Sequence, residues 1–167
     1  MIITGMKAYK MGIVENLISP EMQIQPAGIE LTLNSVWKFI DSGTIDLTNK
    51  YRRIPEVEQI PFDNEGKVHL KMGAYKIIYN EIIKIPRNMI AIGLPRSSLL
   101  RCGATINTAL WDPGYIGRSE SLLHVYNEHG ITLYKNARII QLIFIELEEE
   151  PHKTYEGKYQ KENINLN

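Results

Sequence analysis

An acid and an aromatic ring stand on either side of a two-residue turn in "DPGY", residues 112–115 of this 167-residue chain. A residue before proline favours an extended backbone, and Pro-Gly suits the central positions of a type II turn. The turn would therefore fix Asp112 and Tyr115 at its two ends. A carboxylate held in this way could orient a water as general base, and the ring could pack on a sugar or a base. Taken alone, an ordinary hairpin corner explains these four residues better.

Two hydroxyls and two guanidiniums are gathered in "PRSSLLR", residues 95–101. Serines followed by leucines and an arginine predict a short helix here. Free backbone N–H groups at its start, together with Arg96 and Arg101, would form a cradle for phosphate. A serine-capped helix with surface arginines is the simpler interpretation of this heptapeptide by itself. Both interpretations stay open at this point.

Other kinds of catalytic site find no support in the sequence. There is no Gly-rich phosphate loop of the Walker or dinucleotide type, and no strand-helix alternation to carry one. Cys102 is the only cysteine, and the four histidines are scattered, so no ligand pair has zinc-site spacing. Ser97 and Ser98 lie in no nucleophile elbow. Kinase, dehydrogenase and zinc chemistry are therefore disfavoured.

Strands must position these residues. Apolar or alternating runs predict strands, and Gly-, Asn- and Asp-containing turns separate them: "IELTLNSVWKFI", "AYKIIY", "EIIKI", "NMIAIGL" and "ARIIQLIFIEL". This pattern predicts an all-β jelly roll or barrel with one or two short helices, at residues 12–19 and 96–101. The last run is apolar on nearly both faces, so we expect it to be buried inside a sandwich or against another subunit.

Charge and composition limit the partners and the location. Nineteen basic residues balance nineteen acidic ones, so no net field attracts nucleic acid or an anionic membrane. No stretch approaches the roughly 18 apolar residues of a membrane span, and a single cysteine fits a reducing, cytoplasmic compartment. The apolar content of 44% supports one domain, residues 1–147. The charged, amide-rich segment 148–167 predicts a flexible tail.

Five motifs occur in a fixed order: "IQPAGIELTL" (24–33), "PRSSLLR" (95–101), "TALWDPGYIGR" (108–118), "ARIIQLIF" (137–144) and "YEGKYQ" (155–160). Together they resemble the superfamily of trimeric dUTP pyrophosphatases and zinc-independent dCTP deaminases. The resemblance covers most of the chain and implies a distorted β jelly roll in a homotrimer whose active sites lie between subunits. The stretch around "DPGY" is most similar to archaeal-type dUTP pyrophosphatases.

The resemblance also implies roles for individual residues. The triphosphate would be bound by polar side chains of the 95–101 motif and the last strand: Arg96, Ser97, Ser98, Arg101 and Gln141. The closing segment, which in the family folds over the bound nucleotide, would contribute Lys158, Tyr159 and Gln160. Asp112 would activate water near the deoxyribose, on which Tyr115 would pack. Glu30 would hold Mg²⁺ through water.

One position in the strand after the turn separates the two reactions of the superfamily. Deaminases and bifunctional members carry a glutamate about ten residues beyond the motif aspartate, which is Leu122 here, or Leu123 or His124 if the register slips. Glu120, the nearest carboxylate, is expected on the solvent side. We therefore expect hydrolysis of dUTP to dUMP and pyrophosphate. The tail looks more deaminase-like, so a dCTP deaminase or bifunctional enzyme remains an alternative, as does a catalytically inactive nucleotide-binding trimer.

Overall fold

Antiparallel strands make up most of the structure, a computed structural model that describes residues 1–165. The strands are β1 (Ile2–Ile3), β2 (Val14–Glu15), β3 (Ile24–Gln25), β4 (Gly28–Phe39), β5 (Val57–Ile60), β6 (Lys67–Leu70), β7 (Gly73–Tyr79), β8 (Ile82–Lys84), β9 (Met89–Pro95), β10 (Ala104–Asn107), β11 (Ile116–Gly117), β12 (Glu120–Val125), β13 (Ile131–Tyr134) and β14 (Arg138–Glu146). The helices are α1 (Gly5–Lys10), α2 (Pro20–Gln23) and α3 (Ser97–Arg101). The expected all-β jelly roll is confirmed, with three short helices among the described residues.

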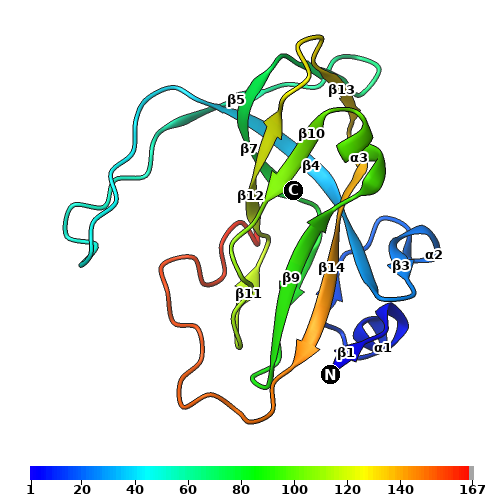
Figure 1. Cartoon of the computed structure of the whole chain (residues 1–167), viewed down its shortest axis with the longest axis vertical. Helices are drawn as coiled ribbons and strands as arrows, with labels where there is room; N and C mark the ends of the chain where they lie inside the picture. Colours follow the sequence, from blue (N-terminus) through cyan, green and yellow to red (C-terminus); the bar gives the residue numbers. More distant parts are fainter. Residues whose placement is uncertain (166–167) are drawn as a thin grey trace.

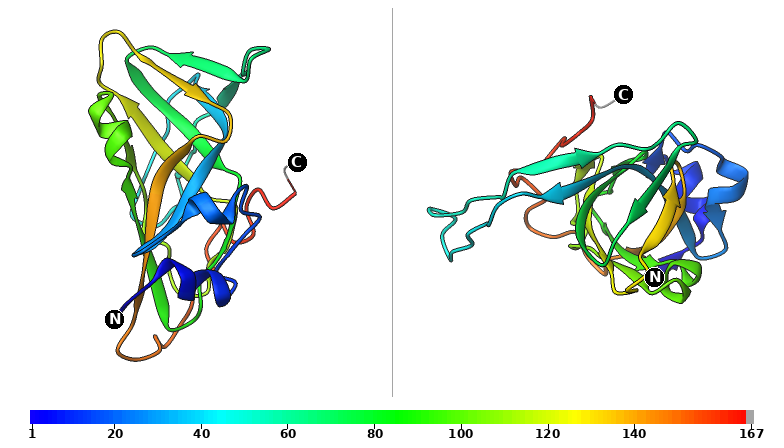
Figure 2. Two further views of the ribbon diagram at one scale, coloured as in Figure 1. Left: turned by 90° about the vertical axis from the view of Figure 1, so that its right-hand side faces the viewer. Right: turned by 90° about the horizontal axis from the view of Figure 1, so that it is seen from above.

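Strand β4 joins the two halves of the main sheet (Figure 1). The strand order is β1-β14-β4-β7-β12-β10, with β9 added to β14 and with β3 and β5 added to β4. The first half of β4 pairs with β14, and its second half pairs with β7 after a register shift between Leu33 and Ser35. Seen from above, the strands curl around one interior (Figure 2). Because β4 pairs with β14, residues of the 24–33 motif lie beside residues of the last strand.

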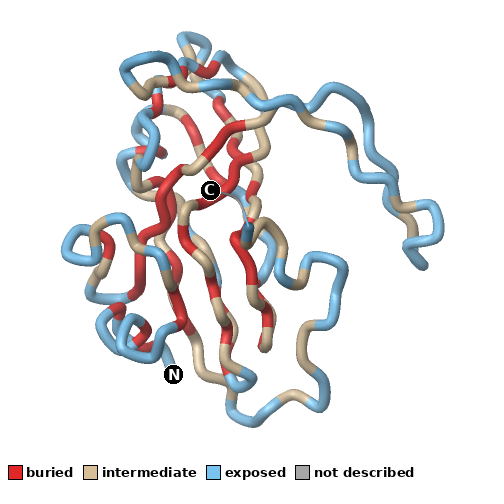
Figure 3. Tube along the Cα trace, turned by 180° about the vertical axis from the view of Figure 1, so that it is seen from behind, coloured by how far each residue is buried: buried red, intermediate tan, exposed pale blue. Residues whose placement is uncertain are grey.

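Buried residues lie along these strands (Figure 3), and their side chains form the core. On β14, Ile140, Leu142 and Phe144 are fully buried, whereas Ile143 and Ile145 on the opposite face are only half-buried within one chain. Side chains alternate between faces along a strand, so these two residues belong to an apolar outer surface. One chain alone therefore covers only one face of this strand.

The helix expected at residues 12–19 is wrong. Residues Val14–Glu15 form β2 and pair with β8, because Ile13 and Val14 are buried against the sheet. Gly12 and Asn16 flank β2 with φ angles of 68° and 61°, which no α-helix allows. The first helix is α1 instead, and the Thr4 side chain caps it by accepting a bond from the Lys7 N–H.

Two segments leave the sheet. Residues 40–56 form a long arm between β4 and β5 (Figure 1), where the Asp46 carboxylate accepts three backbone N–H bonds and Leu47 is 99% exposed. Residues 148–165 return along the body and dock on the turn that precedes β11. Leu166 and Asn167, the end of the expected tail segment, lie outside the described residues. No helix within residues 1–165 is long and apolar enough to cross a membrane.

Candidate active site

The turn at residues 112–115 has the predicted geometry. The Tyr115 N–H donates to the Asp112 carbonyl oxygen over 3.1 Å, and Gly114 has a φ of 83°, as the third position of a type II turn requires. Asp112 remains partly exposed, while Tyr115 is buried. The turn therefore holds a carboxylate and an aromatic ring at its two ends, as the sequence indicated.

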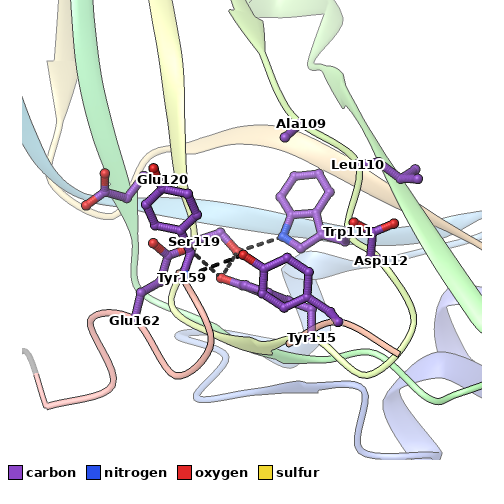
Figure 4. Close-up of a pocket in the computed structure, with 10 residues that line it drawn as sticks. Ala109, Leu110, Trp111, Asp112, Tyr115, Ser119, Glu120, Tyr159 and Glu162 are labelled. Atoms are coloured by element: carbon purple, nitrogen blue, oxygen red, sulfur yellow. Dashed lines mark hydrogen bonds between the residues drawn. The ribbon is translucent and has the colours of Figure 1, made fainter. Parts of the chain in front are cut away.

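A pocket of about 300 Å³ opens beside this turn (Figure 4). One wall is formed by the turn and by Trp111 and Glu120. The other wall is formed by the tail residues Tyr155, Tyr159 and Glu162. The tail therefore closes on a pocket of its own chain.

Hydrogen bonds tie the ring of Tyr115 to both walls (Figure 4). Its hydroxyl donates to Glu162 Oε1 over 2.8 Å and lies 3.0 Å from Ser119 Oγ. Ser119 Oγ in turn accepts a bond of 2.6 Å from Trp111 Nε1. Burial raises the pKa of the Glu162 carboxyl to about 7, and the nearby charge of Glu120 acts in the same direction. Burial also raises the pKa of the Tyr115 phenol, so Tyr115 stays a neutral donor. The docked tail thus carries an acid that titrates near neutral pH.

Gln160 makes the most specific contact between tail and turn. Its Oε1 accepts the Ile116 N–H over 2.8 Å, and its Nε2 donates to the Gly114 carbonyl oxygen over 2.9 Å. The backbone N–H of Lys161 adds a bond of 2.7 Å to the Ile116 carbonyl. Of the other residues expected in the closing segment, Tyr159 lines the pocket and Lys158 is exposed. One amide side chain therefore pairs with both a donor and an acceptor of the turn.

The expected phosphate cradle lies around the start of α3. Arg96 is the N-cap residue and makes no side-chain capping bond, and Ser97 and Ser98 are exposed, so the serine-capped helix is wrong in detail. Arg96 Nε donates to Glu30 Oε1 over 2.6 Å, and Arg138 Nη1 donates to Glu30 Oε2 over 2.9 Å. Glu30 is 5% exposed. This buried carboxylate therefore fixes two guanidiniums side by side.

The remaining expected phosphate residues are spread around this cradle. Gln141 lies opposite Glu30 across β14 and β4, and its Nε2 donates to the Ala27 carbonyl over 3.3 Å. Arg101 ends α3 and is exposed. Arg96 also borders a second pocket of about 380 Å³, which is lined in part by Arg138. Arg96 and Arg138 at Glu30, rather than the whole 95–101 motif, thus form the centre of the expected cradle.

One chain does not bring the cradle and the turn together. Trp111, beside the turn, pairs with Ala91 on β9, and Arg96 follows five residues later. At about 3.3 Å per residue, some 16 Å of strand separates them. Arg96, Ser97, Ser98 and Gln141 do not line the turn pocket. The expected site residues therefore form two groups within the chain.

Three side chains at these groups differ from the sequence-based expectation. Glu120 was expected on the solvent side, but it lines the turn pocket, because the tail covers the outward face of β12. Its carboxylate accepts bonds of 3.1 Å from Lys76 and Asn163. Arg138 and Glu162 are not among the site residues expected from the sequence, although Arg138 stands in the "ARIIQLIF" motif and Glu162 lies two residues beyond "YEGKYQ". Its place in that motif is the sequence signal that indicates Arg138 as a site residue.

The described part of the chain has no preformed site for a metal ion. Residues 1–165 contain no cluster of three or more His, Cys, Asp or Glu side chains that could hold a metal ion. Both oxygens of Glu30, the expected indirect ligand, already accept bonds from guanidiniums. Any divalent ion at this site would therefore be bound mainly by phosphate oxygens of a ligand.

Comparisons with known proteins identify the family to which the chain is similar. Residues 5–147 match the family model described as dCTP deaminase-like. A protein of Methanosarcina mazei, named probable deoxyuridine 5'-triphosphate nucleotidohydrolase, is 50% identical over 153 residues, 92% of this chain and 90% of that protein. The deoxyuridine 5'-triphosphate nucleotidohydrolase of Methanocaldococcus jannaschii is 43% identical over 142 residues, 84% and 88% of the two chains.

A solved structure supports the fold. The 2'-deoxycytidine 5'-triphosphate deaminase of Agrobacterium tumefaciens superposes with a TM-score of 0.64 at 18% sequence identity. The match covers 86% of this chain and 47% of that one, so this chain spans about half the length of the deaminase. At this identity the similarity concerns the fold alone.

Proposed function

Because the chain belongs to the dCTP deaminase-like family, we propose that it hydrolyses dUTP to dUMP and pyrophosphate. The observation that carries the proposal is the 43–50% identity, over most of both chains, to archaeal proteins named for this reaction. The confirmed turn supports it by placing one carboxylate, Asp112, at the rim of a pocket with an aromatic wall. The single cysteine supports a cytoplasmic location.

The proposed chemistry uses the two groups of residues for different parts of the substrate, dUTP with its chelated Mg²⁺. Asp112 takes a proton from a water molecule, whose oxygen attacks the α-phosphorus. The bond from that phosphorus to the bridging oxygen then breaks, and pyrophosphate leaves. Arg96, with the Ser97 and Ser98 hydroxyls, stabilises the charge that grows on the leaving group. Glu30 holds Arg96 in place, and it would contact a magnesium ion only through water.

We propose further that the complete site forms between subunits of a homotrimer. Within one chain, about 16 Å of β9 separates Arg96 from the residue that pairs with Trp111. The outer face of β9 and β14 is apolar: Ile92 pairs with Ile143, and Leu94, 53% exposed, pairs with Gln141. Packing of this face on a second copy would cover the apolar residues. It would also place Gln141, an expected phosphate ligand, at the subunit interface.

The test separates pyrophosphate release from deamination. Purified protein is incubated with Mg²⁺ and either dUTP or dCTP, and nucleotides and pyrophosphate are separated by chromatography. We expect dUMP and pyrophosphate from dUTP, and no product from dCTP. Formation of dUTP or dUMP from dCTP would instead identify a deaminase, with Glu120 as the pocket carboxylate to examine first by Glu120→Gln. Tight binding of dUTP without any product would identify an inactive binding protein.

A further inference from the structure

A fully buried carboxylate lies outside the proposed reaction. Glu81 occupies the corner between β7 and β8 and has no exposed surface. Its acceptors are satisfied by neutral donors: Thr32 N–H at 2.9 Å, Thr32 Oγ1 at 2.6 Å and Gln23 Nε2 at 2.7 Å. Burial raises the pKa of Glu81. Burying a carboxyl is costly, and these bonds offset the cost only while the three donors keep their places.

These bonds reach the strand that carries Glu30. Thr32 and Glu30 are two residues apart on β4, so their side chains point to the same face. The Gln23 amide that donates to Glu81 also donates to the Glu30 carbonyl oxygen over 2.9 Å. The Gln23 Oε1 accepts the Ser19 N–H over 2.8 Å, which fixes the orientation of the amide. Through Thr32 and Gln23, Glu81 thus fixes the backbone around Glu30.

Glu30 in turn fixes the cradle. Its two oxygens accept bonds from Arg96 and Arg138, and Arg96 Nη1 also donates to the Arg138 carbonyl oxygen over 3.1 Å. Arg138 pairs with Thr32 across β14 and β4, so the residue bonded to Glu81 is the direct cross-strand neighbour of one cradle arginine. A shift of Thr32 would therefore move Glu30 and both guanidiniums together.

We propose that Glu81 is a positioning residue for phosphate binding: it holds β4 so that Glu30 presents Arg96 and Arg138 to the phosphates of the nucleotide. The proposal rests on the proposed function only for the identity of the ligand. Glu81 does not contact the ligand, yet it determines how tightly the cradle binds phosphate. The nucleoside end of the ligand, at the separate turn pocket, does not depend on Glu81.

The test measures binding at each end separately, by calorimetry on the full chain. Inorganic pyrophosphate is the probe for the cradle, and deoxyuridine is the probe for the turn pocket. Glu81→Gln keeps the size of the side chain but sets an NH2 group against one of its donors. We expect pyrophosphate affinity to fall about tenfold, the effect of one lost hydrogen bond, and deoxyuridine affinity to stay within twofold. Neither measurement requires turnover, so a failure of this proposal can be distinguished from a failure of the proposed dUTP hydrolysis.

Two further variants keep the result interpretable. Thr32→Val removes the hydroxyl that donates to Glu81 and leaves the backbone donor, so we expect a smaller loss, several-fold, again for pyrophosphate alone. Glu15→Gln removes a partly exposed carboxylate that pairs with Lys84 on β8, and it should change neither affinity. Unchanged pyrophosphate affinity in a folded Glu81→Gln or Thr32→Val protein would overturn the proposal. Equal loss of both affinities would also overturn it, because it would show a general structural role.

Discussion

Replacing Gln160 by alanine should loosen the tail from the turn. The substitution removes the bonds of 2.8 Å and 2.9 Å that the amide makes with Ile116 N and Gly114 O. Each such bond contributes about 0.5–1.5 kcal/mol net, so the loss is about 1–3 kcal/mol. The ratio of docked to undocked tail should therefore fall roughly 5- to 150-fold. The Lys161 bond to the Ile116 carbonyl remains and keeps the effect local.

Amide hydrogen exchange at Ile116 reports this opening directly, because the acceptor of its N–H is the Gln160 side chain. The exchange rate should rise by the same factor as the undocked fraction. Gln160→Glu is a matched variant: its carboxylate can accept from Ile116 but cannot donate to Gly114, and it sets an oxygen against the Gly114 carbonyl oxygen, so it should also open the tail. Lys158→Ala, at an exposed neighbour, is the control. If Ile116 exchanges within twofold of the unmodified protein in both Gln160 variants, the amide does not hold the tail.

Three other substitutions test the remaining parts of the structure. Asp112→Asn should keep dUTP affinity, measured by calorimetry, while turnover falls at least about a hundredfold; full activity would remove Asp112 from the mechanism. Burial raises the pKa of Glu162 from 4.5 to about 7, so docking is fully supported below about pH 4.5 and loses that support as the pH rises through about 7. Fluorescence of the pocket residue Trp111 should follow this transition, and a transition that persists in Glu162→Gln would refute the assignment. Gly28→Ala should lower the free energy of unfolding by at least about 2 kcal/mol, since its Cβ would lie 1.9 Å from the Leu142 carbonyl oxygen. A melting temperature equal to that of the unmodified protein would contradict this close approach.

The sequence predicted well what depends on neighbouring residues. The turn at 112–115 follows from the backbone preferences of Pro113 and Gly114, and its geometry is confirmed. The helix at 97–101 and the strand periodicity likewise have local causes. The resemblance of ordered motifs predicted the family, because several motifs together are more specific than any one of them. Fold class and family therefore required no long-range information.

What the sequence could not supply depends on contacts between distant segments. Residues 12–19 have a pattern compatible with a helix, and only pairing with β8, some seventy residues later, makes Val14 part of a strand. The strand pattern alone predicts Glu120 on the solvent side, because the tail that covers it comes about forty residues later. The bond from Glu81 to Thr32 joins positions 49 residues apart. Motif order also gives no distance, so only the resemblance, which implies active sites between subunits, indicated that Arg96 and the turn could lie apart within one chain.

Because Arg96 and the turn lie apart along β9, mixtures of variants can show whether each site is built from two chains. If each site takes Arg96 from one subunit and Asp112 from another, a chain that lacks one residue can still serve a site that needs only the other. Two inactive proteins, one altered at Arg96 and one at Asp112, should then restore activity when they are unfolded together and refolded as mixed oligomers. With equal amounts and random assembly, about a quarter of the sites would receive both intact residues. In a site built within one chain, the same mixture would stay inactive.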